Sequence, residues 1–187
     1  MITLRAIEES DLGDIDRWRN SKSVFPYVRE YRLLSAKDQE DWFKSYRESR
    51  RDSDWGQELM ILNHSGFGDI GVGGFVRIEW RNRKAELSMY LRGTEVIVPE
   101  KGMVPSDYDP RTDAIYKEAL FELFRYGFDI LGFNKITWPL YGHDPKLGLI
   151  SMLMVEEAVL HDEYFWDGLF HNRHYFSIFK SEFDKAR

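Results

Sequence analysis

One carboxylate of the sequence has the setting of a general base. Glu86 lies in KAELSMYL (residues 84–91), where apolar and polar residues alternate as they do along a half-buried β-strand. Removing a carboxylate from water disfavours its charged form, so a partly buried glutamate becomes a better proton acceptor. The alternative is a residue on the wetter face of the strand that pairs with Lys84 or Arg83. The sequence leaves both interpretations open.

The start of a long helical segment has the setting of an anion site. In PRTDAIYKEAL (residues 110–120), backbone N–H groups at the helix N-terminus would face outward, where the helix dipole favours negative charge. The segment contains no glycine, the residue that lets a phosphate approach the backbone most closely. Asp113 would also place like charge beside a bound anion. An ordinary helix start with an acidic residue near its positive end is the competing interpretation.

Histidines gather near the carboxyl end of the chain, around the dipeptide Asp167-Gly168. If this dipeptide forms a tight hairpin turn, Trp166 faces Leu169 and His161 faces His174. Two facing imidazoles can bind a metal or titrate together. No third ligand is evident, so we favour a polar strand face and expect no metal.

The amino-acid composition excludes or disfavours several kinds of functional site. The 187-residue chain has no cysteine, which excludes disulfides, thiolate nucleophiles and cysteine-ligated zinc. A net charge of −6 argues against the basic surface that nucleic-acid-binding proteins use. No apolar run reaches membrane-spanning length, and the amino-terminal MITLRAIEES carries charge where a signal peptide would be apolar. We expect a cytoplasmic protein that binds neither nucleic acid nor membrane.

The elements that must position these residues alternate between strands and helices. The patterns predict a strand, two helices, three strands, a long helix, a short strand, a further helix and a C-terminal β-hairpin. In chain order, the predicted segments are residues 2–7, Ser10 or Asp11 to Trp18, 35–50, 57–63, 70–80, 84–91, 112–132, 134–140, 145–154 and 156–183.

A glycine- and proline-rich loop (residues 93–111) precedes the long helix and is long enough to suggest a function. The sequence has no internal repeat, linker or low-complexity tract. We therefore expect one domain over residues 1–187, large enough to bury a core. Its class would be mixed α/β, with a mostly antiparallel central sheet flanked by helices and a C-terminal β-hairpin.

This order of elements resembles the GNAT superfamily of N-acetyltransferases, and within it the branch that contains ribosomal-protein N-terminal and amino-sugar acetyltransferases. The resemblance covers nearly the whole chain and is carried by LRAIEESDL, WRN, DWF, KAELSMYL, KEALFELFRYGFDILGFNKI and YFWDGLFHNRHYFSIFKSEF. No single segment is specific to the family, and the resemblance rests on the order in which the segments occur. The resemblance implies a GNAT-like fold and transfer of an acetyl group from acetyl-CoA to a primary amine by direct attack.

The resemblance also implies where acetyl-CoA binds. In this family its pyrophosphate lies at the start of the long helix, in a pattern R/Q-x-x-G-x-G/A that falls here on RTDAIY. Arg111 matches the pattern, whereas Ala114 and Tyr116 replace its glycines. The implied contacts with the donor are Arg111, Ala114, Ile115 and Tyr116 at the helix and Ser88, Met89, Tyr90 and Leu91 on the strand.

Catalytic and acceptor-binding roles follow from the same resemblance. The family often has a glutamate at the position of Glu86, which deprotonates the amine through water. The tyrosine that the family uses as general acid falls on Leu149, and Tyr141 and Ser151 are nearby substitutes. The acceptor pocket would lie between two walls, formed by Trp18, Arg19 and Asn20 on one side and by His171 and His174 on the other.

The departures from the family pattern leave three functions open. The leading one is an N-acyltransferase with a small-molecule or peptide amine as acceptor, acting alone or as a homodimer. The second is a GNAT-fold binding or assembly module without catalysis, which the altered RTDAIY segment and the missing tyrosine favour. The third is an acyltransferase with a donor other than CoA. The fold cannot choose among them, because function resides in the site.

Overall fold

The computed structural model describes residues 1–30, 32–52, 55–92 and 110–187, with only the backbone for residues 49–52, 55 and 110–113. Most of the predicted loop before the long helix, residues 93–109, lies outside the described residues. The side chains of Arg111 and Asp113 are likewise outside this description.

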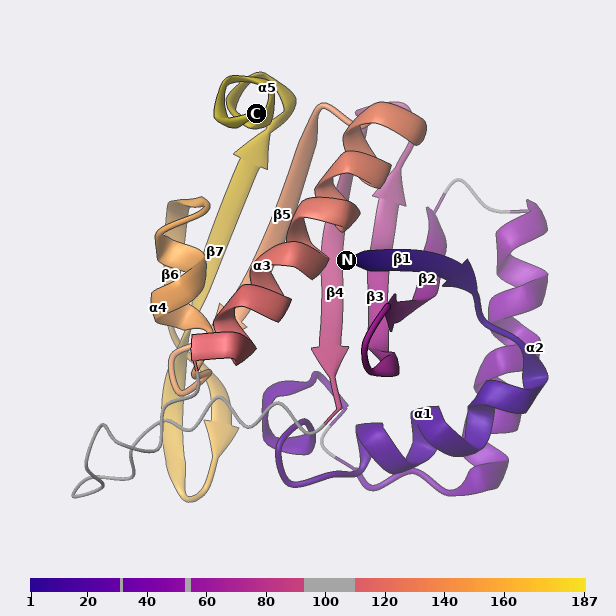
Figure 1. Cartoon of the computed structure of the whole chain (residues 1–187). Helices are drawn as coiled ribbons and strands as arrows, with labels where there is room; N and C mark the ends of the chain where they lie inside the picture. The colour runs from indigo at the N-terminus through magenta and orange to yellow at the C-terminus, as the bar shows by residue number, and fades with distance from the viewer. Residues whose placement is uncertain (31, 53–54, 93–109) are drawn as a thin grey trace.

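All seven strands in the described part of the chain belong to one sheet, in the order β1-β2-β3-β4-β5-β7-β6 (Figure 1). The strands are β1 (Ile2–Ala6), β2 (Trp55–His64), β3 (Gly68–Glu79), β4 (Lys84–Leu91), β5 (Lys135–Tyr141), β6 (Val155–Trp166) and β7 (Leu169–Phe179). Neighbours pair antiparallel except for β4 and β5, which are parallel. The predicted mixed α/β class with a mostly antiparallel sheet is confirmed.

Five α-helices flank the sheet in the described residues. They are α1 (Leu12–Arg19), α2 (Ala36–Asp52), α3 (Pro110–Arg125), α4 (Leu147–Ser151) and α5 (Lys180–Ala186). A π-helical turn (Tyr126–Ile130) extends α3, and Gly132 follows it with φ +73°, a conformation that glycine adopts readily at a helix end. None of the helices in this part of the chain is long and apolar enough to cross a membrane.

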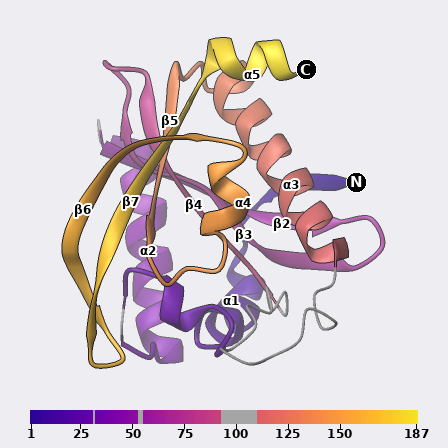
Figure 2. The ribbon, with the colours of Figure 1, turned by 90° about the vertical axis from the view of Figure 1, so that its left-hand side faces the viewer.

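Helices cover both faces of the sheet, with α3 on one and α1 and α2 on the other (Figures 1 and 2). On β2, Met60 and Leu62 pack into the larger apolar cluster together with α3. Leu59 and Ile61 pack into a second cluster together with α1 and α2. Successive side chains of a strand point to opposite faces, so one apolar strand supplies both cores.

Hydrogen bonds at two helix starts explain one boundary that was predicted and one that was not. The hydroxyl of Ser35 accepts the backbone N–H of Asp38 at 3.2 Å, and the Asp38 carboxylate accepts the N–H of Ser35 at 2.8 Å, a capping box at the start of α2. The final strand ends earlier than predicted, at Phe179, because a short helix α5 follows it. The carboxylate of Glu182 accepts the backbone N–H of Phe179 at 2.8 Å and stabilises the start of that helix.

The terminal hairpin has the predicted turn but not the predicted register. Trp166 pairs with Leu169, and Asp167 and Gly168 have φ of +50° and +77°, as a tight hairpin turn requires. The predicted pair of His161 with His174 is wrong, because His174 pairs with Val159. The register shifts between Leu160 and Tyr164, where β6 contains extra residues that form a bulge.

Candidate active site

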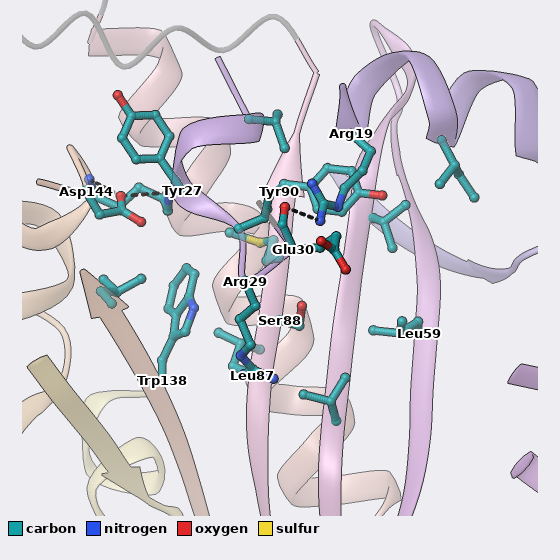
Figure 3. A pocket seen from close by; sticks show the side chains of 18 of the residues that line it. Arg19, Tyr27, Arg29, Glu30, Leu59, Leu87, Ser88, Tyr90, Trp138 and Asp144 are labelled. Atoms are coloured by element: carbon teal, nitrogen blue, oxygen red, sulfur yellow. Dashed lines mark hydrogen bonds and ion pairs between the residues drawn. The ribbon is translucent and has the colours of Figure 1, made fainter. Parts of the chain in front are cut away.

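A cavity of about 430 Å³ lies where β4 and β5 separate. The two parallel strands pair at Lys84 with Lys135, at Ala85 with Ile136 and at Glu86 with Thr137, and the described residues beyond these do not pair. Residues 87–90 of β4 and residues 138–141 of β5 then line the two sides of the cavity. Figure 3 shows Trp138 across the opening from Leu87 and Ser88. The splayed strands thus create a slot inside an otherwise continuous sheet.

The segment between α1 and α2 forms a further wall of this cavity. Its lining residues include Tyr27, Arg29 and Glu30, and Arg19 at the end of α1. A ring nitrogen of His143, in the segment after β5, lies 3.0 Å from the carbonyl oxygen of Pro26 and connects this wall to the far side of the slot.

Of the three residues predicted on this wall, the structure brings only Arg19 to the cavity. Trp18 is buried in the apolar cluster beneath α1 and α2. The amide of Asn20 bonds to both backbone groups of Leu34, at 2.8 and 3.0 Å, and so anchors the incoming end of α2. Asn20 therefore supports the wall without lining the cavity.

The four predicted donor-binding residues of β4 divide between the cavity and the core. Ser88, Met89 and Tyr90 line the cavity, whereas Leu91 is buried in the larger cluster. Beyond Glu86, β4 continues to pair with β3 but not with β5. Backbone groups on the β5 side can therefore bind an extended amide chain, as an added strand would be bound.

At the start of α3, the residues that replace glycine point in different directions. Tyr116 is 4% exposed, packs into the larger cluster and lines the cavity. Ala114 is exposed, and Ile115 is partly buried against the same cluster. The tyrosine side chain is thus directed into the protein, and the exposed side chain at Ala114 is a methyl group.

Glu86 is buried and lies behind the cavity wall. Its side chain is 8% exposed and forms ion pairs with Arg29 and with Arg77, whose Nη1 lies 3.2 Å from Glu86 Oε2. Arg77 has φ +48° at a register irregularity between Val76 and Glu79 of β3. Such a bulge redirects side chains, and here Arg77 meets the carboxylate on the neighbouring strand. Glu86 is not itself among the lining residues.

Arginine is abundant around this carboxylate. Burial, together with the positive charges of Arg77 and Arg173, lowers the pKa of Arg29 to about 10. Arg173 of β7 lies over the rings of Tyr141 and Tyr175, with its guanidinium carbon 5.7 and 5.2 Å from the two ring centres. A pKa of about 10 leaves Arg29 charged at neutral pH.

A buried ion pair that sequence reasoning missed also lines the cavity. Lys146 Nζ lies 2.7 Å from Asp144 Oδ1, and both side chains are nearly inaccessible to solvent. Burial alone would lower the pKa of Lys146, but the neighbouring Asp144 carboxylate outweighs it, so the net pKa is raised. The available signal was the pair of opposite charges in HDPK, directly after the short buried strand.

The predicted substitutes for the general acid have different settings. Tyr141 is buried, lines the cavity and stacks on Tyr164 with ring centres 3.9 Å apart. Ser151 is exposed on α4, and its hydroxyl donates to the carbonyl oxygen of Gly148 at 2.9 Å. The structure therefore brings Tyr141, but not Ser151, to the cavity.

The hairpin histidines lie beside the cavity rather than in its lining. The His171 ring centre is 4.4 Å from that of His143, and His174 Nδ1 lies 2.5 Å from Glu156 Oε1. No group of three or more histidine, aspartate or glutamate side chains in the described residues could hold a metal ion.

Known proteins are similar to this chain in sequence family and in fold. The sequence matches the family described as Acetyltransferase (GNAT) domain over residues 1–146. A search of curated proteins finds no significant match.

The fold is similar to that of a solved spermidine N-acetyltransferase from Vibrio cholerae in complex with CoA and spermine, at 22% identity and a TM-score of 0.77, with 97% of each chain covered. A chimera of a Vibrio cholerae spermidine N-acetyltransferase gives 21% identity and a TM-score of 0.76, again with 97% of each chain covered. A structure of the Vibrio cholerae spermidine/spermine N-acetyltransferase in complex with manganese ions has 19% sequence identity and a TM-score of 0.71. The match covers 99% of this chain and 96% of that chain. At these identities the likeness shows the fold alone. The family match extends over most of the chain, which therefore belongs to the GNAT acetyltransferase family.

Proposed function

We propose that the protein transfers an acetyl group from acetyl-CoA to a primary amine by direct attack, without a covalent enzyme intermediate. The observation that carries this proposal is the cavity between the separated strands β4 and β5. A slot with open backbone groups along one side suits a narrow chain of amides that ends in a thioester. Family membership supports acetyl transfer, and a solved structure with the same fold contains CoA.

The residues around the slot fit the donor. Ser88, Met89 and Tyr90 would bind its amide-containing arm, and the exposed backbone at the start of α3 would hold its pyrophosphate. Tyr116 does not block that position, since its side chain is buried. When bound, acetyl-CoA supplies the acetyl group and a thiolate leaving group.

The proposed chemistry uses one carboxylate and one phenol. Glu86 would accept a proton from the acceptor ammonium, and the freed amine nitrogen would attack the thioester carbonyl as the carbon–sulfur bond breaks. Because Glu86 does not line the cavity, the proton would reach it through water. Tyr141 lines the cavity and would give its phenol proton to the thiolate, and the tyrosinate would take the second proton that the nitrogen loses as the amide forms. Ser151 has no part in this proposal, because its hydroxyl is bonded on exposed α4.

Calorimetry with acetyl-CoA, followed by a thiol-release assay with a panel of primary amines, tests the proposal. We expect measurable binding and amine-dependent release of CoA. Absence of binding at about millimolar acetyl-CoA would contradict it, because a productive donor site should bind more tightly than that. Such a result would favour the non-catalytic module or an acyltransferase with another donor, both consistent with the altered glycine pattern at Ala114 and Tyr116.

The nature of the acceptor is a separate question. The neighbouring structures are spermidine N-acetyltransferases, and one contains spermine, which suggests a polyamine as one candidate. The branch of ribosomal-protein and amino-sugar acetyltransferases offers peptide amines and amino sugars instead. The charges around the cavity discriminate among these.

A further inference from the structure

Positive charge is concentrated at the inner end of the cavity, although the whole chain carries a net charge of −6. Arg29 and Arg77 both pair with Glu86, and Arg173 is close enough to Arg29 to affect its titration. Two guanidinium groups thus pair with one carboxylate, and a third acts on Arg29. The local excess of positive charge is opposite in sign to that of the protein.

The side chains of Arg29 and Glu86 differ in exposure, and this difference determines which of the two charges a ligand contacts. The Arg29 side chain is 40% exposed and lines the cavity, whereas the side chain of Glu86 is 8% exposed and does not. Figure 3 shows Arg29 extending along β4 toward Leu87, where the two strands begin to separate. A molecule that enters the slot therefore contacts the guanidinium and not the carboxylate.

A second arginine that lines the cavity, Arg19, forms no ion pair with a carboxylate among the described residues. Arg19 Nη2 donates to the backbone carbonyl of Glu30 at 3.0 Å, a neutral partner. Its Nη1 is buried, with no hydrogen-bond partner in the part of the chain that the structure describes. A buried guanidinium N–H without an acceptor is costly, which indicates that an acceptor atom comes from a ligand.

The acidic side chains of the cavity are already engaged. Glu30 accepts two hydrogen bonds from the Arg32 side chain, both at 2.8 Å. Asp144 pairs with Lys146 at 2.7 Å. The carboxylate of Asp38 accepts the Ser35 hydroxyl at 2.6 Å and the Ser35 backbone N–H at 2.8 Å. Glu30 and Asp144, which already pair with cations, are therefore poor sites for additional ammonium groups of an acceptor, whereas Asp38 has only neutral partners among these contacts.

We infer that the acceptor carries an anionic group, a carboxylate or a phosphate, in addition to its amine, and that Arg29 binds this group at the inner end of the slot. The inference rests on the proposed acetyl transfer and specifies its substrate class. The guanidinium has five N–H donors in a planar fork, so one edge can hold Glu86 while another binds an oxyanion. A polyamine brings only positive charge to this arginine and is disfavoured.

Matched amines that differ only in an anionic group test this inference. The pairs are tyrosine with tyramine, β-alanine with propylamine, and phosphoethanolamine with ethanolamine, and spermidine is the polycationic comparison. We expect the wild type to have a kcat/KM about tenfold or more higher for the anionic member of at least one pair, because a charge-assisted contact is worth that much. Comparison of the two carboxylate pairs with the phosphate pair identifies which oxyanion the protein prefers.

Variants of Arg29 test whether this residue causes the preference for anionic amines. Arg29→Met should abolish the preference, with the loss confined to the anionic amines. Arg29→Lys keeps a cation beside Glu86, and so preserves folding, but loses the fork and should retain only part of the preference. The control is Arg17→Met, on the exposed face of α1, where Arg17 pairs with Asp14. It should leave the preference unchanged.

The possible results separate this inference from the function on which it rests. If acetyl-CoA binds and amines are acetylated with equal rates within every pair, or fastest for spermidine, the inference is overturned and the acetyltransferase stands. A preference that survives in both Arg29 variants overturns the assignment to Arg29. If acetyl-CoA does not bind, the proposed function and the inference fail together.

Discussion

The role of Glu86 depends on the residues that contact its side chain. Its position on a buried strand is as expected for a base, but Arg29 and Arg77 pair with its carboxylate. The pairing also orients Arg29 toward the cavity. The proposed base thus also holds a proposed binding residue in place.

Replacement of Glu86 tests its role in the reaction. We expect Glu86→Gln to lower kcat by about 10² or more at neutral pH while acetyl-CoA binding changes little, because glutamine keeps the shape but cannot accept the proton. Steady-state rates and calorimetry give the two quantities. Glu79→Gln is the matched control, since Glu79 pairs with Lys84 at the far end of the same hairpin. Unchanged turnover in Glu86→Gln would leave Glu86 with a structural role only.

At the scale of elements, one arginine joins β1 to the start of α1 and to β3. Arg5 contacts both carboxylate oxygens of Asp11 at 2.8 Å and one of Asp69 at 2.5 Å. The hydrogen bond from Arg5 lowers the pKa of Asp11. Burial acts in the opposite direction on Asp69, but hydrogen bonds from Arg5 and Asn63 outweigh it and its pKa is lowered too.

This ion-pair cluster predicts a pH-dependent contribution to stability. The pKa of each aspartate is lower in the folded than in the unfolded state, so the contribution is complete above about pH 5 and is lost as the pH falls through the folded-state values. Arg5→Met should lower the free energy of unfolding by about 1 kcal/mol at pH 7, a value kept small because the arginine is partly exposed. The difference should vanish near pH 2. Urea titrations at several pH values measure it, and a difference that grows on acidification would contradict this account.

The start of α3 yields a prediction about donor binding. Arg111→Ala should weaken acetyl-CoA binding by about 1.5–3 kcal/mol, the worth of a charge-assisted contact. Ala114→Gly should tighten it, because Ala114 is exposed and its Cβ is the group that limits approach to the backbone. Tyr116→Gly is unsuitable as a companion, since it would leave a cavity in the core and cost about 3–5 kcal/mol of stability.

Calorimetry on the single variants provides the measurement for α3. Lys117→Ala, in the next turn and exposed, is the matched control for loss of positive charge and should bind acetyl-CoA as the wild type does. Binding that is insensitive to both Arg111→Ala and Ala114→Gly would move the phosphate site away from this helix.

At the scale of the whole molecule, the two apolar clusters share the strands that separate them. Trp18 lies in the cluster beneath α1 and α2, and Trp138 lies in the cluster beneath α3. Because β2 contributes to both, neither cluster should persist without the other. This argument supports the single domain over residues 1–187, which stays a prediction.

Equilibrium unfolding tests that prediction. Urea transitions followed by tryptophan fluorescence in Trp18→Phe and in Trp138→Phe, and by far-UV circular dichroism, should have the same midpoint within each variant. Distinct midpoints for the two spectroscopic signals would show that the two sides of the sheet unfold separately.

The sequence by itself determined the order and type of the main elements, but not the short helix α5 that ends the chain. Alternation of apolar residues in Lys84–Leu91 identifies a strand, helical spacing before Gly132 identifies α3, and Asp167-Gly168 identifies the hairpin turn. These features depend on local periodicity and on the backbone preferences of single residues, which neighbours in the sequence determine. The family resemblance rested on this order and was correct at the level of the superfamily.

Only the tertiary structure decided which side chains meet. The bulge in β6 moved His161 away from His174, and the bulge in β3 brought Arg77 to Glu86. Arg29 had no periodic or motif signal that marked it as a cavity residue, and for Lys146 the signal was the pair of opposite charges in HDPK. Contacts between segments far apart in the chain depend on register and packing, and a register shift of one residue reverses the face to which a side chain points. For that reason the fold could be predicted from the sequence, while the charges inside the candidate active site required the structure.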